Sequence, residues 1–354
     1  MRFLFVVSGR DVPSTRFRIL PYIPLLEQAG HRCDVAYSWP QKYDYFPQIG
    51  WRLSQLLKRS VRRVQTLMAR FRSYDAIVIE REVFDNDSSE IEEKLRRYSE
   101  RLILDVDDGV FLLHPEKFDR ISRICDIAIA GNTWLRQYLQ QRCDVVTQIP
   151  TCVRLSEYPQ RKPEAQRAAD PKVGWIGTTH NVGFLGVAQD ALRRVYETHK
   201  FSLIVVAPSD EKLKEIDLGS IPVDFRKWSP STEVDDLLDM DLGLMPLPEG
   251  EEWMKYKCGL KLIQYLAVGI PGIASPIGVN QDILEGNSVG RAASNHQQWE
   301  DSLAELLAAP ELRKQLGAAG RELVKDRYSI EGNLSRLEAC LCEPLDQVKR
   351  ITGA

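Results

Sequence analysis

Short apolar runs alternate with helix-like segments along the whole chain. Such runs, separated by apolar residues at helical spacing, are typical of buried parallel strands joined by crossover helices. The predicted strands are residues 2–7, 33–37, 76–79, 102–106, 127–130, 145–149, 173–176, 201–206, 223–225, 242–245, 270–275 and 289–292. The pattern predicts an α/β protein with doubly wound parallel sheets.

The helical patterns and the break between the two series of strands indicate two domains. Helices are expected at about 15–29, 183–199, 232–238 and 297–308, and Asn132 is expected to cap another. Residues 152–172 are polar, charged and proline-bearing, as in an interdomain linker. We therefore expect an N-terminal domain over 1–152 and a C-terminal domain over 172–327. Ligands of such sheets bind beyond the carboxyl ends of the strands, so two facing edges would form an interdomain cleft.

The first strand of each domain lacks the dinucleotide-binding fingerprint. That fingerprint needs Gly-x-Gly-x-x-Gly directly after a strand. The first strand instead continues into residues 8–18, which contain a single glycine, Gly9. In the second domain Gly174 lies inside the strand and only Gly177 follows it. A nicotinamide-dependent dehydrogenase is therefore excluded.

The segment 257–280 combines a basic loop, a helix, a buried strand and a glycine turn. Helical spacing runs from 257 to 266, and Gly269 can end the helix in a left-handed conformation. Residues 270–275 are apolar and strand-like, and Gly278 turns the chain toward another helix. Two lysines and several backbone N–H groups would converge here, which suits a diphosphate.

This segment resembles the donor-site segment of GT-B glycosyltransferases of the retaining family 4 type. Gly259, Ala267, Gly269 and Pro271 are in register with that family, and residues 261–271 fit a lysine-containing variant found among GT-B enzymes. The two glutamates of the family fall on Tyr256 and Gln264. The resemblance extends over nearly the whole chain and is strongest after residue 173. It implies the GT-B fold, two Rossmann-like domains facing an interdomain cleft, with a last helix of about 328–345 packing back on the N-terminal domain.

The resemblance also implies an activity. The C-terminal domain would bind a nucleotide sugar, and the N-terminal domain a hydroxyl acceptor such as a glycan or a lipid-linked sugar. The enzyme would retain the anomeric configuration and use neither a metal nor another cofactor, in cell-envelope polysaccharide or glycolipid synthesis. Two alternatives remain open: a nucleotide-sugar epimerase or hydrolase of GT-B fold, and a non-catalytic GT-B scaffold in glycan assembly. The absence of both family glutamates supports the scaffold.

Candidate donor-binding residues lie at the ends of elements in the second domain. The loop after the strand at 173–176 has small residues that let a phosphate approach the backbone, although an ordinary turn with Asn181 as a helix cap is the alternative. A cation at Lys261 would stabilise the charge that grows on the leaving diphosphate, and Lys257, four residues earlier, would share one side of the helix start. Two solvated lysines are the alternative. The candidate donor contacts are Gly177, Thr178, His180, Asn181, Lys257, Gly259, Lys261, Gln264, Gly278, Val279 and Asn280.

A group of aspartates dominates the first domain. The strand at 102–106 delivers Asp105, Asp107 and Asp108 to its carboxyl end. Crowded carboxylates repel one another, so at least one should have a raised pKa. Asp107 or Asp108 would orient the acceptor hydroxyl, while a metal site and a capped turn are the alternatives. The family has a histidine near this position, and His114 could substitute for it.

Further charged residues end neighbouring strands. Arg16 and Arg18 follow the first strand two positions apart, so only one can easily face a ligand. Glu80 ends the third strand on the same edge. All three are candidate acceptor-side residues, and surface ion pairs are the alternative.

Residues 51–72 form a basic amphipathic pattern. Leu57, Val61, Val64, Met68 and Phe71 recur at helical spacing, and the stretch holds seven basic residues and no acid. This pattern fits peripheral attachment to an anionic membrane leaflet. A core-facing helix with a charged outer surface is the alternative.

Composition adds limits. The 354 residues carry a net charge of -3, which argues against a nucleic-acid partner. No apolar run approaches the length of about 18 residues that a membrane span needs. The seven cysteines are scattered, as expected of reduced thiols. We therefore expect a cytoplasmic protein, at the inner face of the cell membrane if residues 51–72 attach there.

Overall fold

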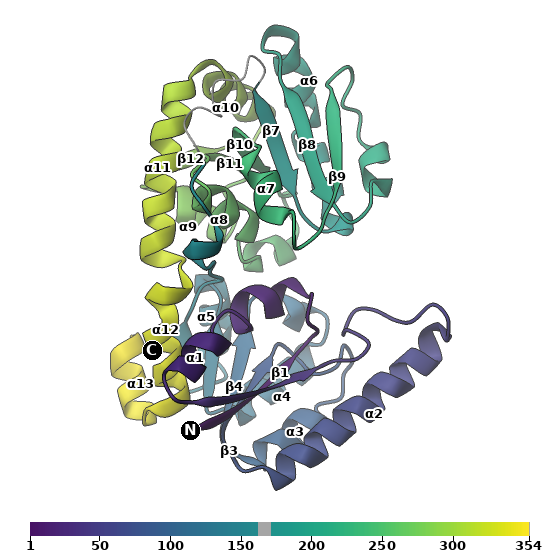
Figure 1. The fold of residues 1–354 in the computed structure, drawn as a ribbon, viewed down its shortest axis with the longest axis vertical. Coiled ribbons are helices and arrows are strands. Elements are labelled where there is room, and N and C mark those ends of the chain that lie inside the picture. Colours follow the sequence, from purple (N-terminus) through teal and green to yellow (C-terminus); the bar gives the residue numbers. More distant parts are fainter. Residues whose placement is uncertain (162–170, 354) are drawn as a thin grey trace. The chain divides into compact units, whose positions relative to one another are not determined.

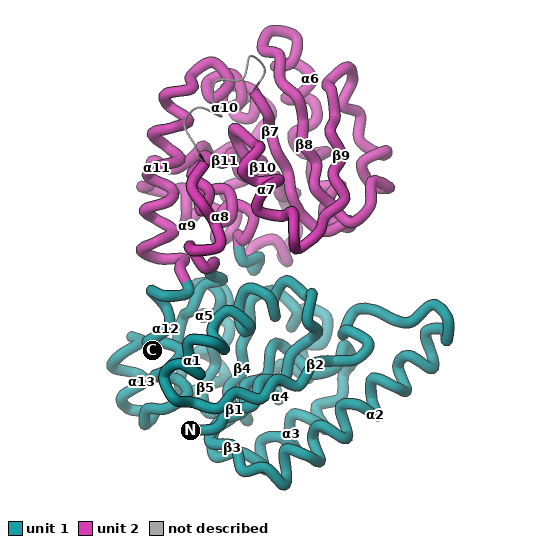
Figure 2. The backbone as a smooth tube through the Cα atoms, viewed as in Figure 1, with its two compact units in different colours: residues 1–152, 256–258, 330–354 teal, residues 153–255, 259–329 magenta. Residues whose placement is uncertain are grey.

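The computed structural model describes residues 1–161 and 171–353, and these form two compact units. Unit 1 comprises Met1–Cys152, Tyr256–Cys258 and Ile330–Ala354, and unit 2 comprises Val153–Lys255 and Gly259–Ser329 (Figure 2). Residues 162–170 of the predicted linker lie outside the described part of the chain.

Unit 1 contains a six-stranded parallel sheet (Figure 1). Its spatial order is β2-β1-β3-β4-β5-β6, so the direction of strand succession reverses between β1 and β3. The strands are β1 (Arg2–Val7), β2 (Arg32–Tyr37), β3 (Tyr74–Glu80), β4 (Ser99–Val106), β5 (Ile127–Ala130) and β6 (Val146–Gln148). Every predicted strand of the first series is present, which confirms the doubly wound prediction for this half.

Helices cover the sheet of unit 1. They are α1 (Ile23–Gln28), α2 (Gly50–Phe71), α3 (Glu90–Arg96), α4 (Pro115–Ile124), α5 (Thr133–Gln140), α12 (Ile330–Cys342) and α13 (Leu345–Thr352), with short turns η1 (Thr15–Ile19) and η2 (Val110–Leu112). The last two helices belong to this unit, because Ile330, Leu341 and Val348 join the core around Phe3 and Phe5.

One predicted helix of unit 1 is wrong and one predicted cap is confirmed. The helix expected over 15–29 is broken into the π-helical turn η1 and the separate helix α1. Pro24 stands in the first turn of α1, and Pro21 also lacks an N–H, so one hydrogen-bond ladder cannot continue through both. Asn132 caps α5 as predicted, since its side chain accepts a hydrogen bond from Leu135 N at 2.8 Å.

Unit 2 contains the second six-stranded parallel sheet. Its order is β12-β11-β10-β7-β8-β9, and the direction of succession reverses between β7 and β10. The strands are β7 (Lys172–Ile176), β8 (Ser202–Ala207), β9 (Val223–Lys227), β10 (Leu242–Met245), β11 (Gly272–Ala274) and β12 (Gly290–Ala292). The second predicted series is therefore also confirmed.

The helical elements of unit 2 are η3 (Leu155–Glu157), η5 (Thr179–Val187), α6 (Gln189–Thr198), η6 (Glu211–Glu215), α7 (Glu233–Leu238), η7 (Glu252–Tyr256, which ends in unit 1), α8 (Leu260–Ala267), α9 (Val279–Leu284), α10 (His296–Ala308) and α11 (Pro310–Arg327). Two helices of unit 2 begin later than predicted, whereas α7 and α10 begin within one residue of the predicted starts. The helix expected over 183–199 begins only at Gln189, after the 3₁₀ turns of η5. Helix α8 starts after Gly259, whose φ of 68° is left-handed and interrupts a right-handed helix.

Tyr265 joins two strands at the reversal point of unit 2. Strands β7 and β10 pair only at Val173 with Leu242 and at Gly174 with Gly243. Beyond that point the Tyr265 hydroxyl accepts from Ile176 N at 3.2 Å and donates to Leu244 O at 3.1 Å. A side chain thus satisfies backbone groups where the two strands separate.

In the described part of the chain, every helix falls short of the length and apolar character that a bilayer crossing requires.

Tyr265→Phe is expected to lower the free energy of unfolding by about 1–3 kcal/mol, because a buried N–H and a buried C=O lose their shared partner. Denaturant unfolding of the full-length protein, followed by tryptophan fluorescence, measures the change. The half-buried Tyr196→Phe is the matched control. Equal stability of the two variants would contradict a bridging role for the Tyr265 hydroxyl.

Candidate functional site

The two reversal points locate the candidate sites. In open parallel sheets, ligands bind beyond the carboxyl ends of the strands where the order reverses. In unit 1 this point follows β1 and β3, and in unit 2 it follows β7 and β10. The sequence-predicted residues fall at these two edges, and each edge is described by itself.

Arg18 and Asp105 form a buried pair at the edge of unit 1. Arg18 Nε and Nη2 lie 2.8 and 2.5 Å from the two carboxylate oxygens of Asp105, and Nη1 donates to Thr151 Oγ1 at 3.2 Å. Burial raises the pKa of Asp105, although the Arg18 charge opposes that shift. Arg18 is therefore committed to an internal carboxylate, and Arg16 lies outside this pair, half-buried, with its guanidinium over the Phe17 ring.

Glu80 serves the loop that follows β1. Its carboxylate accepts hydrogen bonds from Ser8 N at 3.2 Å and Thr15 Oγ1 at 2.5 Å, and also from Ser14 Oγ. The residue is buried, so the alternative of a surface ion pair is wrong. Its geometry fixes the turn between β1 and η1 and thereby positions Arg16 and Arg18.

Arg81 holds Asp107 in place and was not predicted as a site residue. Arg81 Nε lies 2.5 Å from Asp107 Oδ1, and Nη1 lies 3.3 Å from the Tyr43 hydroxyl. Arg81 has a φ of 58°, the left-handed region that costs a non-glycine residue free energy. Burial alone would raise the pKa of Asp107, but the charge and hydrogen bond of Arg81 bring it below the ordinary value. The sequence signal that could have identified Arg81 is its position between two acidic residues, Glu80 and Glu82, at the end of β3.

Asp108 differs from its neighbour. Its Oδ1 accepts from Gly109 N at 2.9 Å, and its Oδ2 lies 4.0 Å from Arg81 Nη2. Burial raises the pKa of Asp108, and the charges of Lys257 and Arg81 reduce this shift without cancelling it. The expected raised pKa among these aspartates is therefore present, at Asp105 and at Asp108.

Lys257 lies with the acidic edge of unit 1. It precedes α8 and belongs to unit 1, where its charge acts on Asp108. The prediction that Lys257 and Lys261 share one side of a helix start is wrong, because Gly259 ends the preceding loop before α8 begins. Tyr256 stands at one of the family's glutamate positions. The centroid of its ring lies 4.8 Å from that of the Phe111 ring, in an edge-to-face arrangement.

His114 has other partners than the aspartates after β4. Its Nδ1 lies 2.7 Å from Asp87 Oδ1, and its Nε2 lies 3.0 Å from Asp85 Oδ1. Both ring nitrogens thus face carboxylates of the 85–87 loop. Within the described residues no cluster of three or more His, Cys, Asp or Glu side chains could hold a metal ion.

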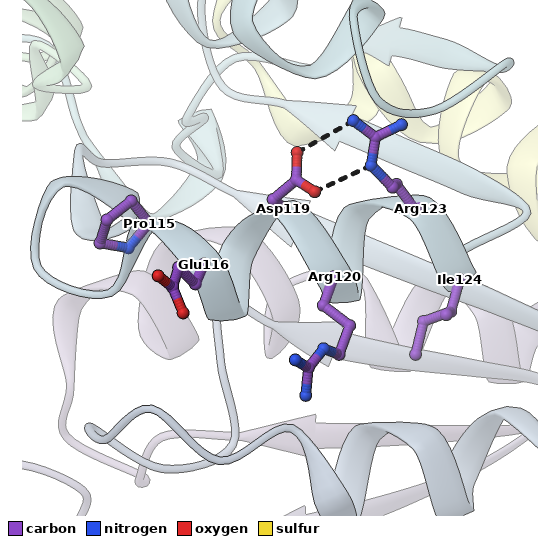
Figure 3. Close-up of a pocket in the computed structure, with 6 residues that line it drawn as sticks. All are labelled: Pro115, Glu116, Asp119, Arg120, Arg123 and Ile124. Carbon is purple, nitrogen blue, oxygen red and sulfur yellow. Dashed lines mark hydrogen bonds and ion pairs between the residues drawn. The ribbon is translucent and has the colours of Figure 1, made fainter.

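The described residues of unit 1 include two surface depressions that could be compared with the site. One, of about 590 Å³, follows helix α4, and Figure 3 shows Asp119 and Arg123 paired on this helix. Its lining comes from one helix and does not include the strand ends. The other, of about 360 Å³, is lined by Trp39, Pro40, Gln41, Tyr43, Asp44, Tyr45 and Phe46. Tyr43 connects this aromatic depression to Arg81 and hence to Asp107.

In unit 2, Lys261 lies beside the loop that follows β7. Its Nζ is 5.5 Å from the centroid of the Trp175 ring, a cation–π arrangement. A Cβ added at Gly177 would lie only 2.6 Å from Lys261 Cε and 2.7 Å from Trp175 Cη2. The absence of a side chain at Gly177 therefore lets the lysine pass directly under the backbone of this loop.

The rest of that loop forms η5. Thr178 and His180 are exposed, and Asn181 is partly buried and donates its N–H to Thr178 O at 3.0 Å. The alternative of Asn181 as a helix cap is wrong, since α6 begins only at Gln189.

The start of α9 is built on a close backbone approach. Gly278 has a φ of 57°, and a Cβ there would lie 2.4 Å from Lys255 O, so only glycine fits. Val279 and Asn280, the next two residues, are buried. Val279 packs against Gly259, where an added Cβ would lie 2.8 Å from Val279 Cγ1. Asn280 Nδ2 donates to Ser275 O at 3.2 Å, while its buried Oδ1 has no hydrogen-bond partner among the described residues.

Gln264 is paired with a carboxylate from another helix. Its Nε2 donates to Glu233 Oε1 at 2.9 Å and to the Tyr158 hydroxyl at 3.1 Å. Glu233 also accepts from Trp228 Nε1 at 2.7 Å. A buried carboxylate thus lies next to Gln264, where the resemblance leads one to expect a glutamate. Glu233 was not recognisable from the sequence, because it resembles any acidic residue in the first turn of a helix.

Asp107→Asn is expected to destabilise unit 1 by about 3 kcal/mol at neutral pH, because Arg81 keeps a buried charge without its main partner. The pKa of Asp107 is lowered in the folded state, so its contribution is complete above the unfolded value of about 3.9 and is lost as the pH falls through the folded value. The difference from wild type should therefore shrink in acid. Urea unfolding from neutral pH down to about pH 2 measures the difference. The half-exposed Asp119→Asn, whose ion pairs with Arg123 and Arg142 are screened by solvent, is the control and should change stability much less. A difference independent of pH would contradict this account.

Comparisons with known proteins place these edges in a common fold. No family model and no curated protein matches the chain. Among solved structures, sucrose-phosphate synthase from Thermosynechococcus elongatus matches with a TM-score of 0.70 at 17% identity, over 99% of this chain and 98% of that one. HepE from Anabaena, solved with UDP and glucose, matches with a TM-score of 0.65 at 15% identity, over 97% and 99%. The lipopolysaccharide outer core galactosyltransferase WaaB matches with a TM-score of 0.62 at 14% identity, over 96% and 99%. With its two six-stranded parallel sheets and this near full-length likeness, the chain has the GT-B fold.

Proposed function

We propose that this protein is a glycosyltransferase that moves a sugar from a nucleotide-sugar donor to a hydroxyl acceptor. The observation that carries the proposal is the edge of unit 2, where Lys261 passes beneath Gly177 at the reversal point of the sheet. A fixed cation beside the backbone of a loop at a strand end suits a diphosphate. Similar structures support a nucleotide sugar in particular, since HepE was solved with UDP-glucose.

Unit 2 would bind the donor. Backbone N–H groups of the Gly177 loop and the Gly278 turn would donate to phosphate oxygens, and Lys261 would neutralise the leaving diphosphate. Charge grows on the β-phosphate as the glycosidic bond breaks, so Lys261 stabilises the transition state more than the ground state. Glu233, held against Gln264, would accept a hydrogen bond from the ribose. The remaining predicted contacts would line or support the same edge: Thr178, His180, Asn181, Gly259, Val279 and Asn280.

Unit 1 would bind the acceptor. Asp107 is fixed as a carboxylate by Arg81, whereas Asp108 has a raised pKa and lies beside Lys257. This contrast suits Asp108 for accepting a hydrogen bond from the attacking hydroxyl, with Asp107 positioning Arg81 and Tyr43. Arg18 and Glu80 would act as positioning residues, because both are saturated by internal contacts. Aromatic faces at the depression around Tyr43 suit the apolar face of a sugar ring.

The resemblance supports two finer points of the proposal: retention of configuration and chemistry without a metal. WaaB, an enzyme of the lipopolysaccharide outer core by its name, supports a role in cell-envelope glycan or glycolipid synthesis. One observation favours a non-catalytic scaffold instead: Gln264, at a family glutamate position, is bound internally to Glu233 and Tyr158. A hydrolase or epimerase would turn over the donor without any acceptor.

Nucleotide binding is the first test. UDP, GDP, ADP, TDP and CMP are compared without added metal by thermal shift. One diphosphate is expected to raise the free energy of unfolding of wild type by about 2.7 kcal/mol at a hundredfold excess over its Kd, and thereby to raise the melting temperature. Lys261→Ala should weaken its binding by about 10- to 100-fold, because a charge-assisted hydrogen bond is lost.

Lys212→Ala removes an exposed lysine of the same unit and serves as the matched control. If no nucleotide stabilises wild type, the scaffold replaces the enzyme as the proposal. If Lys261→Ala binds as tightly as the control, the diphosphate lies elsewhere.

Asp108→Asn is expected to slow transfer by about 10²–10³-fold, the range of a lost general base or hydroxyl acceptor. Nucleotide binding should be unchanged, because the substitution lies in unit 1. The pKa of Asp108 is raised, so wild-type transfer should fall as the pH drops through a value above the ordinary aspartate range. Asp108→Asn should lack that acid limb. Release of nucleotide with and without acceptor measures both rates, and a full rate for Asp108→Asn would remove this residue from the chemistry.

A further inference from the structure

Helix α2 packs into unit 1 through a polar face. Its buried residues are Ser54, Lys58, Arg62, Thr66 and Ala69. Arg62 donates to Val7 O at 2.6 Å and to Ala36 O at 2.8 Å, which are carbonyls at the carboxyl ends of β1 and β2. Lys58 donates to Lys42 O at 2.6 Å and to Asp44 O at 3.1 Å. The expected alternative, a core-facing helix with a charged outer surface, is therefore wrong.

The apolar side of α2 faces outward. Positions three and four residues apart share one helix face, and such a row runs along the side opposite Arg62. Its exposed members, with Met68 at its margin, are Leu53, Leu56, Val64, Leu67, Met68 and Phe71, with exposed fractions from 42% for Met68 to 76% for Phe71. Trp51 at the start of the helix is exposed as well. This set is called the apolar row below.

A line of cations borders the apolar row. Arg52, Arg59, Arg63 and Arg70 follow at spacings of seven, four and seven, so they lie along one flank, and all four are exposed. Residues 50–71 contain no aspartate or glutamate. The rest of the chain is slightly acidic, because the net charge of the whole protein is -3 despite this segment.

We propose that α2 is a membrane-docking helix that lies in the interface of an anionic lipid bilayer. The apolar row would enter the boundary between headgroups and acyl chains, and the arginine flank would meet the phosphates. An apolar face of this width beside a purely cationic flank is the arrangement of interfacial helices. The charge complementarity favours lipid over a protein partner, because every phospholipid headgroup around the helix offers a phosphate. The helix has 22 residues, or about 33 Å of continuous contact in the plane of the membrane.

This inference is independent of the proposed catalysis, since it rests on exposure and charge alone. If both hold, the acceptor is presented at the membrane surface as a lipid-linked sugar. Lipid binding is measured by sedimentation and nucleotide binding by thermal shift, so failure of one leaves the other intact.

The test is co-sedimentation of the full chain with vesicles of phosphatidylcholine alone or mixed with phosphatidylglycerol. Wild type should bind the anionic vesicles much more tightly than the neutral ones, and added salt should weaken binding. The double variant L56Q/L67Q should bind the anionic vesicles more than about tenfold more weakly, because two large apolar side chains are lost from the contact. R59Q/R63Q should lose about fivefold per arginine.

Two control variants match these changes away from α2. V223Q/I351Q replaces two other exposed apolar residues, and K212Q/K214Q removes two other exposed cations. Both should bind as wild type does. Unchanged melting temperatures would show that the α2 variants are folded.

Two results would overturn the proposal. The first is binding of L56Q/L67Q to anionic vesicles as tight as that of wild type. The second is a wild-type dimer in lipid-free solution that L56Q/L67Q converts to monomer, since the apolar row would then be covered by a second copy of the chain.

Discussion

The carboxyl edge of the unit 1 sheet concentrates negative charge, and the surrounding residues supply the cations and hydrogen-bond donors that this charge requires. Five carboxylates end β3 and β4: Glu80, Glu82, Asp105, Asp107 and Asp108. Carboxylates taken out of water need nearby cations or hydrogen-bond donors. Arg18 pairs with Asp105, Arg81 with Asp107, and Lys42 with Glu82, while hydroxyls and an N–H serve Glu80. The left-handed backbone of Arg81 is the local cost of bringing its guanidinium to Asp107.

The same edge decides which face of α2 is buried. The carbonyls at the ends of β1 and β2 also need donors, and Arg62 supplies them from α2. Burial lowers the pKa of Arg62 to about 10, which still leaves it charged at neutral pH. A helix that must deliver a guanidinium and an ammonium inward turns its leucines outward. The apolar row is therefore exposed because the opposite, polar face of α2 is the one that contacts the interior.

The strands were predictable and the partners of the charged residues were not. Period and burial are local properties, so runs such as 242–245 marked their strands at the right residues. The carboxyl-edge positions of Asp105, Asp107 and Asp108 followed from the end of β4. Pairing depends on distance in space, and neither Arg81 with Asp107 nor Glu233 with Gln264 is near in sequence. For α2, the hydrophobic periodicity was correct, but periodicity gives two faces without saying which is buried. Lys257 was misplaced because a left-handed glycine, Gly259, separates it from the helix that its spacing suggested.

The arginines that border the apolar row also act before any contact is made. Two bare copies of α2 would gain free energy by covering each other's leucines, as any exposed apolar patch can. The cationic flanks of the two copies repel each other and oppose that approach, as charged residues beside an aggregation-prone apolar segment do. Such repulsion between exposed charges reaches only about 10 Å at 0.1 M salt and less at higher ionic strength. Screening of these arginines by salt should therefore favour self-association through the apolar row, whereas dilute buffer should keep the chains apart.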